Sequence, residues 1–207
     1  MRAREHWEGV YEQKAPERVS WYRPHLEQSL KFIDDARLDR DAAIIDVGGG
    51  ASTLVDDLLG RGYVNVTVLD VSPTAIASAK ARLGRRASAV RWLTADITQT
   101  ELAAGAYDFW HDRAVFHFLR DEEDRRRYVA AAKRSVKPGG HILVATFGPE
   151  GPSRCSGLDV VRYDPDGLHA QFGAAFQKVG SSTEVHETPS GAEQQFVYCD
   201  CRLSDAE

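Results

Sequence analysis

The sequence predicts an α/β domain with a seven-stranded, mostly parallel sheet, helices on both faces and an antiparallel last strand. From residue 42 onward, short apolar runs alternate with helical stretches, which is typical of parallel strands joined by crossover helices. The first run, AAIIDV at residues 42–47, is almost wholly apolar, as expected for a strand covered on both sides. The end of the chain differs, because residues 176–186 and 192–203 flank the turn sequence TPSG and resemble a hairpin.

Each element has its own signal in the sequence. Apolar runs predict strands at residues 42–47, 64–70, 89–93, 107–111 and 141–147. Helices are predicted at residues 52–61, 73–83, 121–137 and 164–172. The second helix has a clear start, because Ser72 suits the cap position and Pro73 the first helical position. The sequence KPGG at residues 137–140 predicts a tight break before the fifth strand.

The bulk composition argues against several classes of protein. A net charge of −5 does not suit a dedicated nucleic-acid binder, which usually has a basic face. No apolar run reaches the roughly 18 residues of a membrane span, and the N-terminus lacks the apolar core of a secretory signal. The odd number of cysteines favours a reduced, cytoplasmic setting. Cys199 and Cys201 lack two further ligands, so no metal site is expected.

A glycine-rich turn follows the first strand. Gly48, Gly49 and Gly50 stand between that strand and a helix, where glycine lets the backbone approach a ligand and adopt positive φ. The free N–H groups of the following helix add hydrogen-bond donors. Alone the turn predicts only a tight connection, so its meaning depends on the neighbouring strand ends.

Two acidic residues end neighbouring strands in register with this turn. Asp70 lies twenty positions after Gly50, where a carboxylate can accept both hydroxyls of a ribose. Asp96 follows the third strand and is well placed to accept a hydrogen bond from an adenine amino group. Either aspartate alone suits a helix cap or a turn. Both in register predict a nucleoside site.

The same turn distinguishes between two nucleoside cofactors. The NAD fingerprint requires a third glycine three residues after the second, and this chain has Thr53 there. Asp46 at the strand end would repel a pyrophosphate. Its carboxylate suits a cationic ligand with an amino group, or can hold the turn by accepting backbone N–H bonds. S-adenosylmethionine carries a sulfonium and an ammonium and no phosphate, so it is the predicted cofactor.

These motifs resemble the class I S-adenosylmethionine-dependent methyltransferases, whose fold is Rossmann-like. The matching segments are DVGGGAS at residues 46–52, LDV at 69–71, ADI at 95–97, DRAVFHFL at 112–119 and KPGGH at 137–141. The resemblance implies that Gly48 and Gly50 line the methionine part of the cofactor and that Asp70 holds the ribose. It further implies that Val71 packs on adenine and that Asp96 and Ile97 border the base. Arg113 would hold the methionine amino group through its backbone.

A narrower resemblance covers the N-terminus. HWEGVY at residues 6–11 and VSWY at 19–22 are similar to a group that contains protein-lysine methyltransferases and uncharacterised bacterial enzymes. The resemblance implies that Trp7 and Tyr11 wrap the cofactor, where an aromatic ring near a sulfonium gains about 0.5–2 kcal/mol. The alternative is that these aromatic residues and Trp21 only pin an N-terminal helix onto the domain.

The acceptor side carries fewer signals. His117 is a candidate general base, with a packed structural residue as the alternative. Residues 147–163 are punctuated by glycine and proline and are a candidate lid, in which Arg154 or Arg162 would be able to bind an acidic group. The chain has no Asn-Pro-Pro-aromatic motif after the fourth strand, which argues against amide, nucleobase or glutamine acceptors.

These expectations combine into a single methyltransferase domain over residues 1–207. It comprises an N-terminal helical cap at 1–40, a cofactor-binding core at 41–147, and an acceptor-side loop and C-terminal hairpin at 148–207. The predicted function is in-line methyl transfer to a small-molecule acceptor. Protein-lysine N-methylation is the alternative, and an NAD-dependent oxidoreductase or a non-catalytic cofactor-binding protein are further readings.

Overall fold

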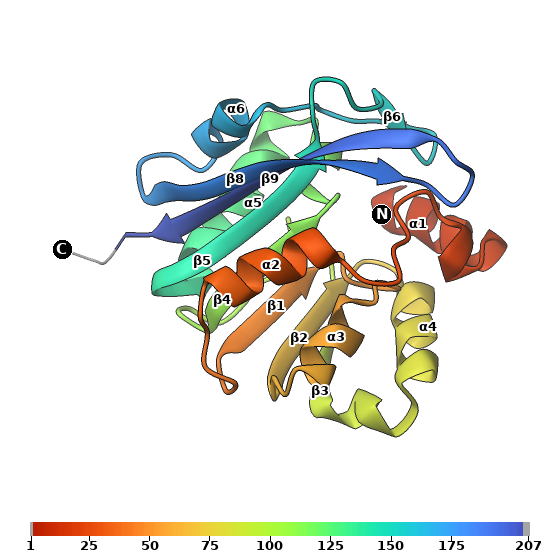
Figure 1. The fold of residues 1–207 in the computed structure, drawn as a ribbon, viewed down its shortest axis with the longest axis horizontal. Helices are drawn as coiled ribbons and strands as arrows, with labels where there is room; N and C mark the ends of the chain where they lie inside the picture. Colours follow the sequence, from red (N-terminus) through yellow and green to blue (C-terminus); the bar gives the residue numbers. More distant parts are fainter. Residues whose placement is uncertain (1, 205–207) are drawn as a thin grey trace.

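The computed structural model describes residues 2–204 and confirms the predicted α/β architecture. Seven strands form one sheet in the order β3-β2-β1-β4-β5-β9-β8. Five of them pair in parallel, whereas β9 is antiparallel to both of its neighbours. Figure 1 shows the parallel strands in the lower half and the long β8–β9 hairpin crossing above them.

The elements follow the predicted order. The strands are β1 Ala43–Val47, β2 Asn65–Asp70, β3 Val90–Thr94, β4 Tyr107–Arg113, β5 Val136–Phe147, β6 Arg154–Cys155, β7 Leu158–Asp159, β8 Phe176–Glu187 and β9 Glu193–Leu203. The α-helices are α1 Arg2–Gln13, α2 Glu27–Asp35, α3 Leu54–Gly60, α4 Pro73–Leu83, α5 Glu122–Ser135 and α6 Pro165–Ala170. Three short 3₁₀ segments are η1 Pro16–Arg18, η2 Gly84–Ala89 and η3 Phe116–Phe118.

Helix starts agree closely with the sequence signals. The Ser72 hydroxyl accepts a hydrogen bond from the Ala75 amide at 3.0 Å, which satisfies an otherwise free donor of α4. Asp121 caps α5 through the Glu123 amide at 2.7 Å. Such caps stabilise a helix by about 1 kcal/mol each, and here they determine the residues at which α4 and α5 begin.

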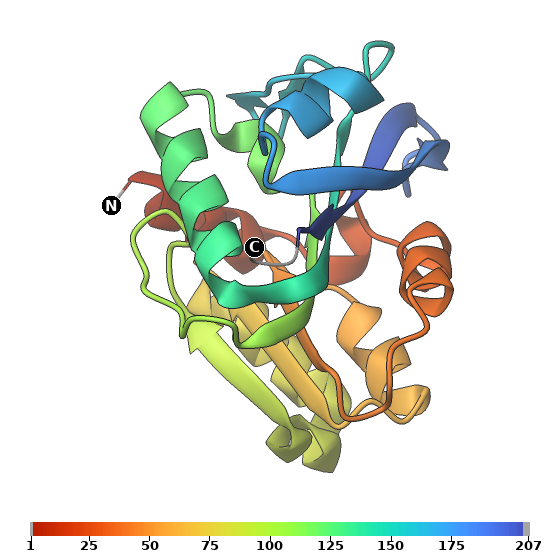
Figure 2. The ribbon, with the colours of Figure 1, turned by 90° about the vertical axis from the view of Figure 1, so that its left-hand side faces the viewer.

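The core has two layers, one on each face of the sheet. Figure 2 shows α5 on one side of the sheet and α2 with α3 on the other. Trp110, Tyr128 and Phe116 are fully buried in the layer under α5. Phe109 and Ile33 are fully buried in the layer under α2. Burial on both faces explains why β1 begins with the apolar run Ala43–Ile45.

Two segments differ from the prediction. The expected break at residues 137–140 lies inside β5, which starts directly after α5. Between the pairs Tyr107↔Val136 and Phe109↔His141, the register shifts, so that the KPGG segment forms a bulge opposite Asp108. Gly139 there has a φ of +74°. The candidate lid also contains a small two-stranded sheet, β6–β7, that the sequence did not predict.

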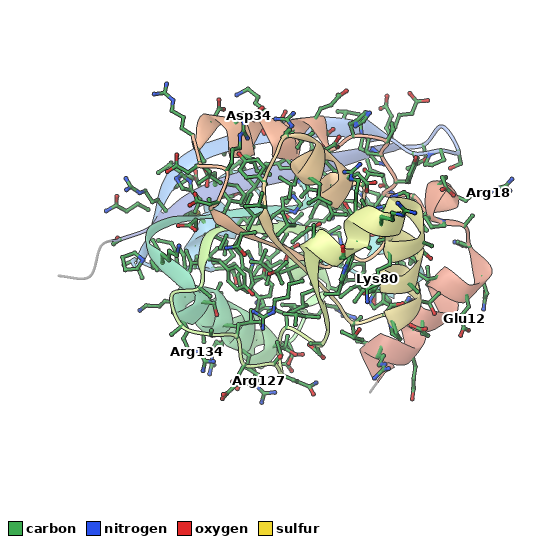
Figure 3. The ribbon with its side chains drawn as sticks, turned by 90° about the horizontal axis from the view of Figure 1, so that it is seen from below. Glu12, Arg18, Asp34, Lys80, Arg127 and Arg134 are labelled. Atoms are coloured by element: carbon green, nitrogen blue, oxygen red, sulfur yellow. The ribbon has the colours of Figure 1, made fainter. Side chains whose placement is uncertain are left out.

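Charged side chains occupy the outside of the molecule. Figure 3 shows Glu12, Arg127 and Arg134 pointing away from the core. On α5, Arg126 pairs with Glu122 and Glu123, so the arginines at 125–127 belong to a salt-bridged helix surface. No helix among residues 2–204 is both long and apolar enough to cross a bilayer.

Candidate functional site

One cavity of about 280 Å³ opens at the carboxyl ends of β1, β2 and β4, under α1. Open α/β sheets bind ligands at this edge, where the direction of strand order reverses. The cavity is lined by ten of the predicted site residues: Trp7, Tyr11, Asp46, Gly48, Gly49, Asp70, Val71, Asp96, Ile97 and Arg113. The other two, Gly50 and His117, are not part of its lining.

The glycine turn is too crowded for side chains. Gly48 has a φ of +72°, and a Cβ atom there would overlap the Val115 side chain. A Cβ on Gly49 would meet the Asp46 carboxylate, and one on Gly50 would lie 2.6 Å from Ala75 Cβ and overlap Asp70. The three glycines therefore let the backbone run between β1 and α4. Gly50 lies behind the wall of the cavity and supports it.

Asp70 is tied to the turn by both carboxylate oxygens. Oδ2 accepts the Gly50 amide at 3.0 Å, and Oδ1 accepts the Ser72 amide at 2.8 Å. Burial raises the pKa of Asp70 to about 6, although these two amides act to lower it. Each oxygen retains a second lone pair, so the carboxylate can still accept a ligand hydroxyl.

Asp46 belongs to a buried chain of polar groups under the turn. Its Oδ1 lies 2.7 Å from His111 Nδ1, and His111 Nε2 lies 2.9 Å from Ser29 Oγ. All three side chains are at most 2% exposed. Asp46 Oδ2 has no hydrogen-bond partner among the described residues. A buried oxygen without a donor is costly, so this atom is suited to a cationic ligand group that enters the cavity.

Asp96 is both a turn residue and part of the cavity lining. Its Oδ1 accepts the Thr98 amide at 2.9 Å and the Thr98 hydroxyl at 2.7 Å, which shapes the turn after β3. Oδ2 is bonded to Gln99 Nε2 at 3.1 Å. Asp96 and Ile97 also line the cavity together with Val71. The ends of β2 and β3 thus bring a carboxylate and two apolar side chains to the place where the resemblance puts adenine.

Helix α1 covers the cavity with aromatic side chains. The Trp7 ring packs edge-on against Phe118 at 4.9 Å and against Trp21 at 5.7 Å between ring centroids. Tyr11 packs edge-on against Trp21 at 6.2 Å. The Glu8 carboxylate binds the Ser72 hydroxyl at 2.7 Å and the Thr74 hydroxyl at the start of α4. Figure 1 shows α1 beside α4. Trp7 and Tyr11 therefore both pin the helix and face the cavity.

Arg113 is the last residue of β4, whereas the sequence placed it just after the strand. Its side chain leads away from the glycine turn, with Nε donating to Tyr198 Oη at 3.1 Å and Nη1 to the Trp21 carbonyl at 2.9 Å. The guanidinium carbon lies 4.2 Å from the centroid of the Phe196 ring. Nη2 is buried and has no partner among the described residues.

His117 lies outside the cavity, in the turn after β4. It is fully buried, and its Nδ1 accepts the Phe147 amide at 3.3 Å. Burial lowers the pKa of His117 to about 3, and the charge of Arg113 acts in the same direction. A base that is neutral and packed between aromatic rings suits a structural role, and the geometry gives the expected general base no path to a substrate.

The neighbouring Asp112 holds the turn that follows β4. Its carboxylate accepts the Val115 amide at 2.8 Å, the Phe116 amide at 3.1 Å and the Tyr128 hydroxyl at 2.6 Å. Burial raises the pKa of Asp112 to about 6. These bonds hold the turn so that the Val115 side chain lies against Gly48. Asp112 therefore supports the wall of the cavity without lining it.

The candidate lid contributes to the cavity only in part. Cys155 and Leu158 line it, and burial raises the pKa of the Cys155 thiol to about 11. Arg154 and Arg162 lie outside the lining and donate to carbonyl groups of their own segment. The structure therefore does not place either of them at the cavity. No cluster suited to a metal ion occurs within residues 2–204.

Comparison with known proteins agrees with this geometry. Residues 45–144 match a family model described as a methyltransferase domain. The family model and the relatives together support a class I S-adenosylmethionine-dependent methyltransferase. The matched segment runs from β1 to β5 and so contains the glycine turn, Asp70 and Asp96.

Two curated relatives illustrate the range of this superfamily. The chain is 26% identical over 145 residues to an eEF1A lysine and N-terminal methyltransferase of Bos taurus, covering 67% of this chain and 20% of that protein. It is 31% identical over 110 residues to a malonyl-[acyl-carrier protein] O-methyltransferase of a Paenibacillus species, covering 51% of this chain and 39% of that protein. The chain thus spans well under half the length of both.

Solved structures share the whole fold. A methyltransferase of Burkholderia thailandensis, crystallised with 1,6-didemethyltoxoflavin and S-adenosylhomocysteine, has a TM-score of 0.74 at 20% identity and covers 98% of this chain and 88% of its own. A structure described in connection with echinomycin biosynthesis has a TM-score of 0.80 at 19% identity, covering 99% of this chain and 94% of its own.

The residues at the cavity fit S-adenosylmethionine. The unpartnered Asp46 Oδ2 suits the ammonium group, and three glycines leave the backbone free to approach the ligand. Asp70 and Asp96 provide acceptors for ribose and adenine. The sequence did not identify His111 and Ser29 as parts of this site, because their partners lie 65 and 82 residues away along the chain.

Proposed function

We propose that the protein is an S-adenosylmethionine-dependent methyltransferase (EC 2.1.1.-) that methylates a small-molecule acceptor in the cytoplasm. The observation that carries the proposal is the buried carboxylate of Asp46, which lines a cavity walled by glycines and has one oxygen without a partner within residues 2–204. An anionic, phosphate-excluding wall suits a cofactor with a sulfonium and an ammonium group. When bound, S-adenosylmethionine supplies both the methyl group and its leaving group.

The chain itself provides alignment and exclusion of water, as in-line displacement requires. Asp70 and Asp96 would hold the nucleoside, and Asp46 would hold the amino group. Trp7 and Tyr11 on α1 close the cavity above them, since both line it. Aromatic rings beside a sulfonium would also favour its charge by cation–π attraction.

The aromatic lining of the cavity supports a small acceptor. Trp21, Phe118 and Leu158 line it from three separate segments of the chain and offer an apolar surface to such a molecule. A protein lysine is the second candidate. The relatives named for lysine methylation cover about two thirds of this chain, for example a human EEF1A lysine methyltransferase 2 that is 22% identical over 157 residues.

Calorimetry and isotope labelling test the proposal separately. We expect S-adenosylhomocysteine to bind the purified protein with measurable heat, and NADH to give none. Incubation with S-adenosyl-[methyl-³H]methionine and a cell extract should then label the small-molecule fraction. Label in protein would favour the lysine alternative, and binding of NADH without S-adenosylhomocysteine would overturn the assignment of the cofactor.

A further inference from the structure

The side chain of Arg113 reaches the half of the cavity that lies away from the glycine turn. Arg113 pairs with Ala145 on β5, and Ala145 pairs in turn with Tyr198 on β9. The guanidinium carbon lies over Phe196, also on β9. Nη1 donates to the Trp21 carbonyl, and Trp21 lines the cavity together with Arg113, so the guanidinium lies on the Trp21 side of the cavity. We call this side of the cavity, lined by Arg113, Trp21 and Leu158, the acceptor end.

The guanidinium is held firmly and yet is incompletely satisfied. Nε and Nη1 donate to Tyr198 Oη and the Trp21 carbonyl, and the Phe196 ring supports its face. Nη2 is buried and has no hydrogen-bond partner within residues 2–204. A cationic donor in this state loses free energy until an acceptor reaches it, and a planar guanidinium matches a carboxylate best.

The surrounding charges leave this end positive. Glu184 shares the Tyr198 hydroxyl with Arg113, and its two oxygens are taken by Arg23 at 2.5 Å and by that hydroxyl at 2.7 Å. Arg23 lines the cavity as well. The side chains of Arg23, Arg113 and Glu184 together carry a net charge of +1. The glycine-turn end instead has Asp46, Asp70 and Asp96.

We propose that the Arg113 side chain binds a carboxylate, or an equivalent anionic group, of the methyl acceptor. This inference rests on the proposed function and narrows it to acidic small molecules with an apolar body. Trp21 and Leu158 would pack against the apolar body, since both line the same cavity. The carboxylate of the methionine moiety is the other source of the same chemistry, and the experiment separates the two.

The test uses benzoate as an acidic aromatic probe and benzamide as its neutral isostere. Wild-type protein saturated with S-adenosylhomocysteine is titrated with each probe by calorimetry or ligand-observed NMR. We expect benzoate to bind better than benzamide, and Arg113→Gln to weaken benzoate by about tenfold or more. Arg113→Lys should restore part of the affinity because it keeps the charge. Arg127→Gln removes a surface charge of α5 and should change nothing.

The cofactor arm compares S-adenosylhomocysteine with 5′-methylthioadenosine, which lacks the amino-acid group. If Arg113→Gln weakens S-adenosylhomocysteine by about tenfold but not 5′-methylthioadenosine, the guanidinium binds the cofactor carboxylate and the acceptor proposal is overturned. Equal binding of benzoate and benzamide to the wild type would also overturn it. Failure of wild-type protein to bind S-adenosylhomocysteine would instead refute the proposed function. Thermal unfolding of each variant checks that it is folded.

Discussion

The two ends of the cavity are built in different ways. The glycine-turn end consists of strand ends and the turns that follow them, with short side chains held by backbone amides, as in the Gly50–Asp70 bond twenty residues apart. The acceptor end is assembled from distant segments. Arg113 meets Tyr198 and Trp21 across 85 and 92 residues of sequence. The first end depends on backbone geometry and the second on side-chain packing, so substitutions should affect them differently.

The largest effect is expected from Gly48→Ala at the glycine-turn end. Alanine at this position would have to adopt the left-handed backbone of Gly48, which costs about 1–2 kcal/mol. Its Cβ would also overlap the Val115 side chain at the cavity wall. We expect the affinity for S-adenosylhomocysteine, measured by calorimetry, to fall by about 100-fold, equivalent to roughly 3 kcal/mol. Gly60→Ala is the control, because a Cβ at that position has no neighbour within 4 Å. Wild-type affinity in Gly48→Ala would show that the turn does not contact the ligand.

The next effect separates charge from shape at the same end. Asp46→Asn keeps the size of the side chain but replaces a carboxylate oxygen by an amide. We expect S-adenosylhomocysteine to bind about 10–100-fold more weakly, since hydrogen bonds to charged groups contribute about 1.5–3 kcal/mol. Binding of 5′-methylthioadenosine should be unchanged because it has no ammonium group. Equal loss for both ligands would mean that Asp46 supports the turn and does not contact the amino group.

The difference between the two ends also explains what the sequence could predict. Asp70 and Asp96 were predicted because Asp70 ends its strand and Asp96 lies in the turn after its strand, so strand periodicity and one turn locate them. The side chain of Arg113 could not be placed, since its direction depends on β9 pairing with β5. The bond between Asp46 and His111 could not be predicted either, because it depends on the pairing of β1 with β4 and no local sequence signal encodes that pairing.

The fold shows the same division between local and distant determinants. Ser72 and Pro73 predicted the start of α4 because a cap depends on neighbouring residues alone. The segment KPGG correctly indicated a local irregularity. It did not indicate that the chain stays in β5, because that depends on the facing strand β4, where Asp108 lies opposite the bulge. His117 was a candidate base because histidine titrates near neutral pH. Its burial in the folded protein, which favours a structural role over that of a base, has no local signal in the sequence.

A third prediction tests whether His117 acts structurally. Its pKa is lowered to about 3 in the folded protein, so the unfolded chain binds a proton below pH 6.5 and the folded chain does not. The stability contributed by neutral His117 is therefore present above pH 6.5 and is lost as the pH falls. Between pH 7 and pH 5, the wild type should lose about 2 kcal/mol relative to His117→Gln, measured by urea unfolding.

The comparison of the two proteins isolates this histidine. Asp70 and Asp112, with pKa values raised to about 6, act in the opposite sense, but they do so equally in both proteins. The pH dependence of methyl transfer should be the same in the folded variant and the wild type. A variant that is stable but inactive, with a missing titration step in its rate profile, would restore the role of general base.

The smallest effect on cofactor binding is expected from Glu8→Gln on α1, the helix that covers the cavity. Glu8 binds the Ser72 and Thr74 hydroxyls, and so fixes the helix that carries Trp7 and Tyr11 over the cavity. Glu8→Gln keeps some of these hydrogen bonds but removes the charge that favours the N-terminus of α4, worth about 0.3–1 kcal/mol. We therefore expect S-adenosylhomocysteine to dissociate about two- to fivefold faster, as followed by tryptophan fluorescence in stopped flow. Glu12→Gln on the same helix is the control, since Glu12 points to solvent (Figure 3). Equal dissociation rates in both variants would mean that α1 is held by its aromatic contacts alone, and that the two ends of the cavity close independently of this carboxylate.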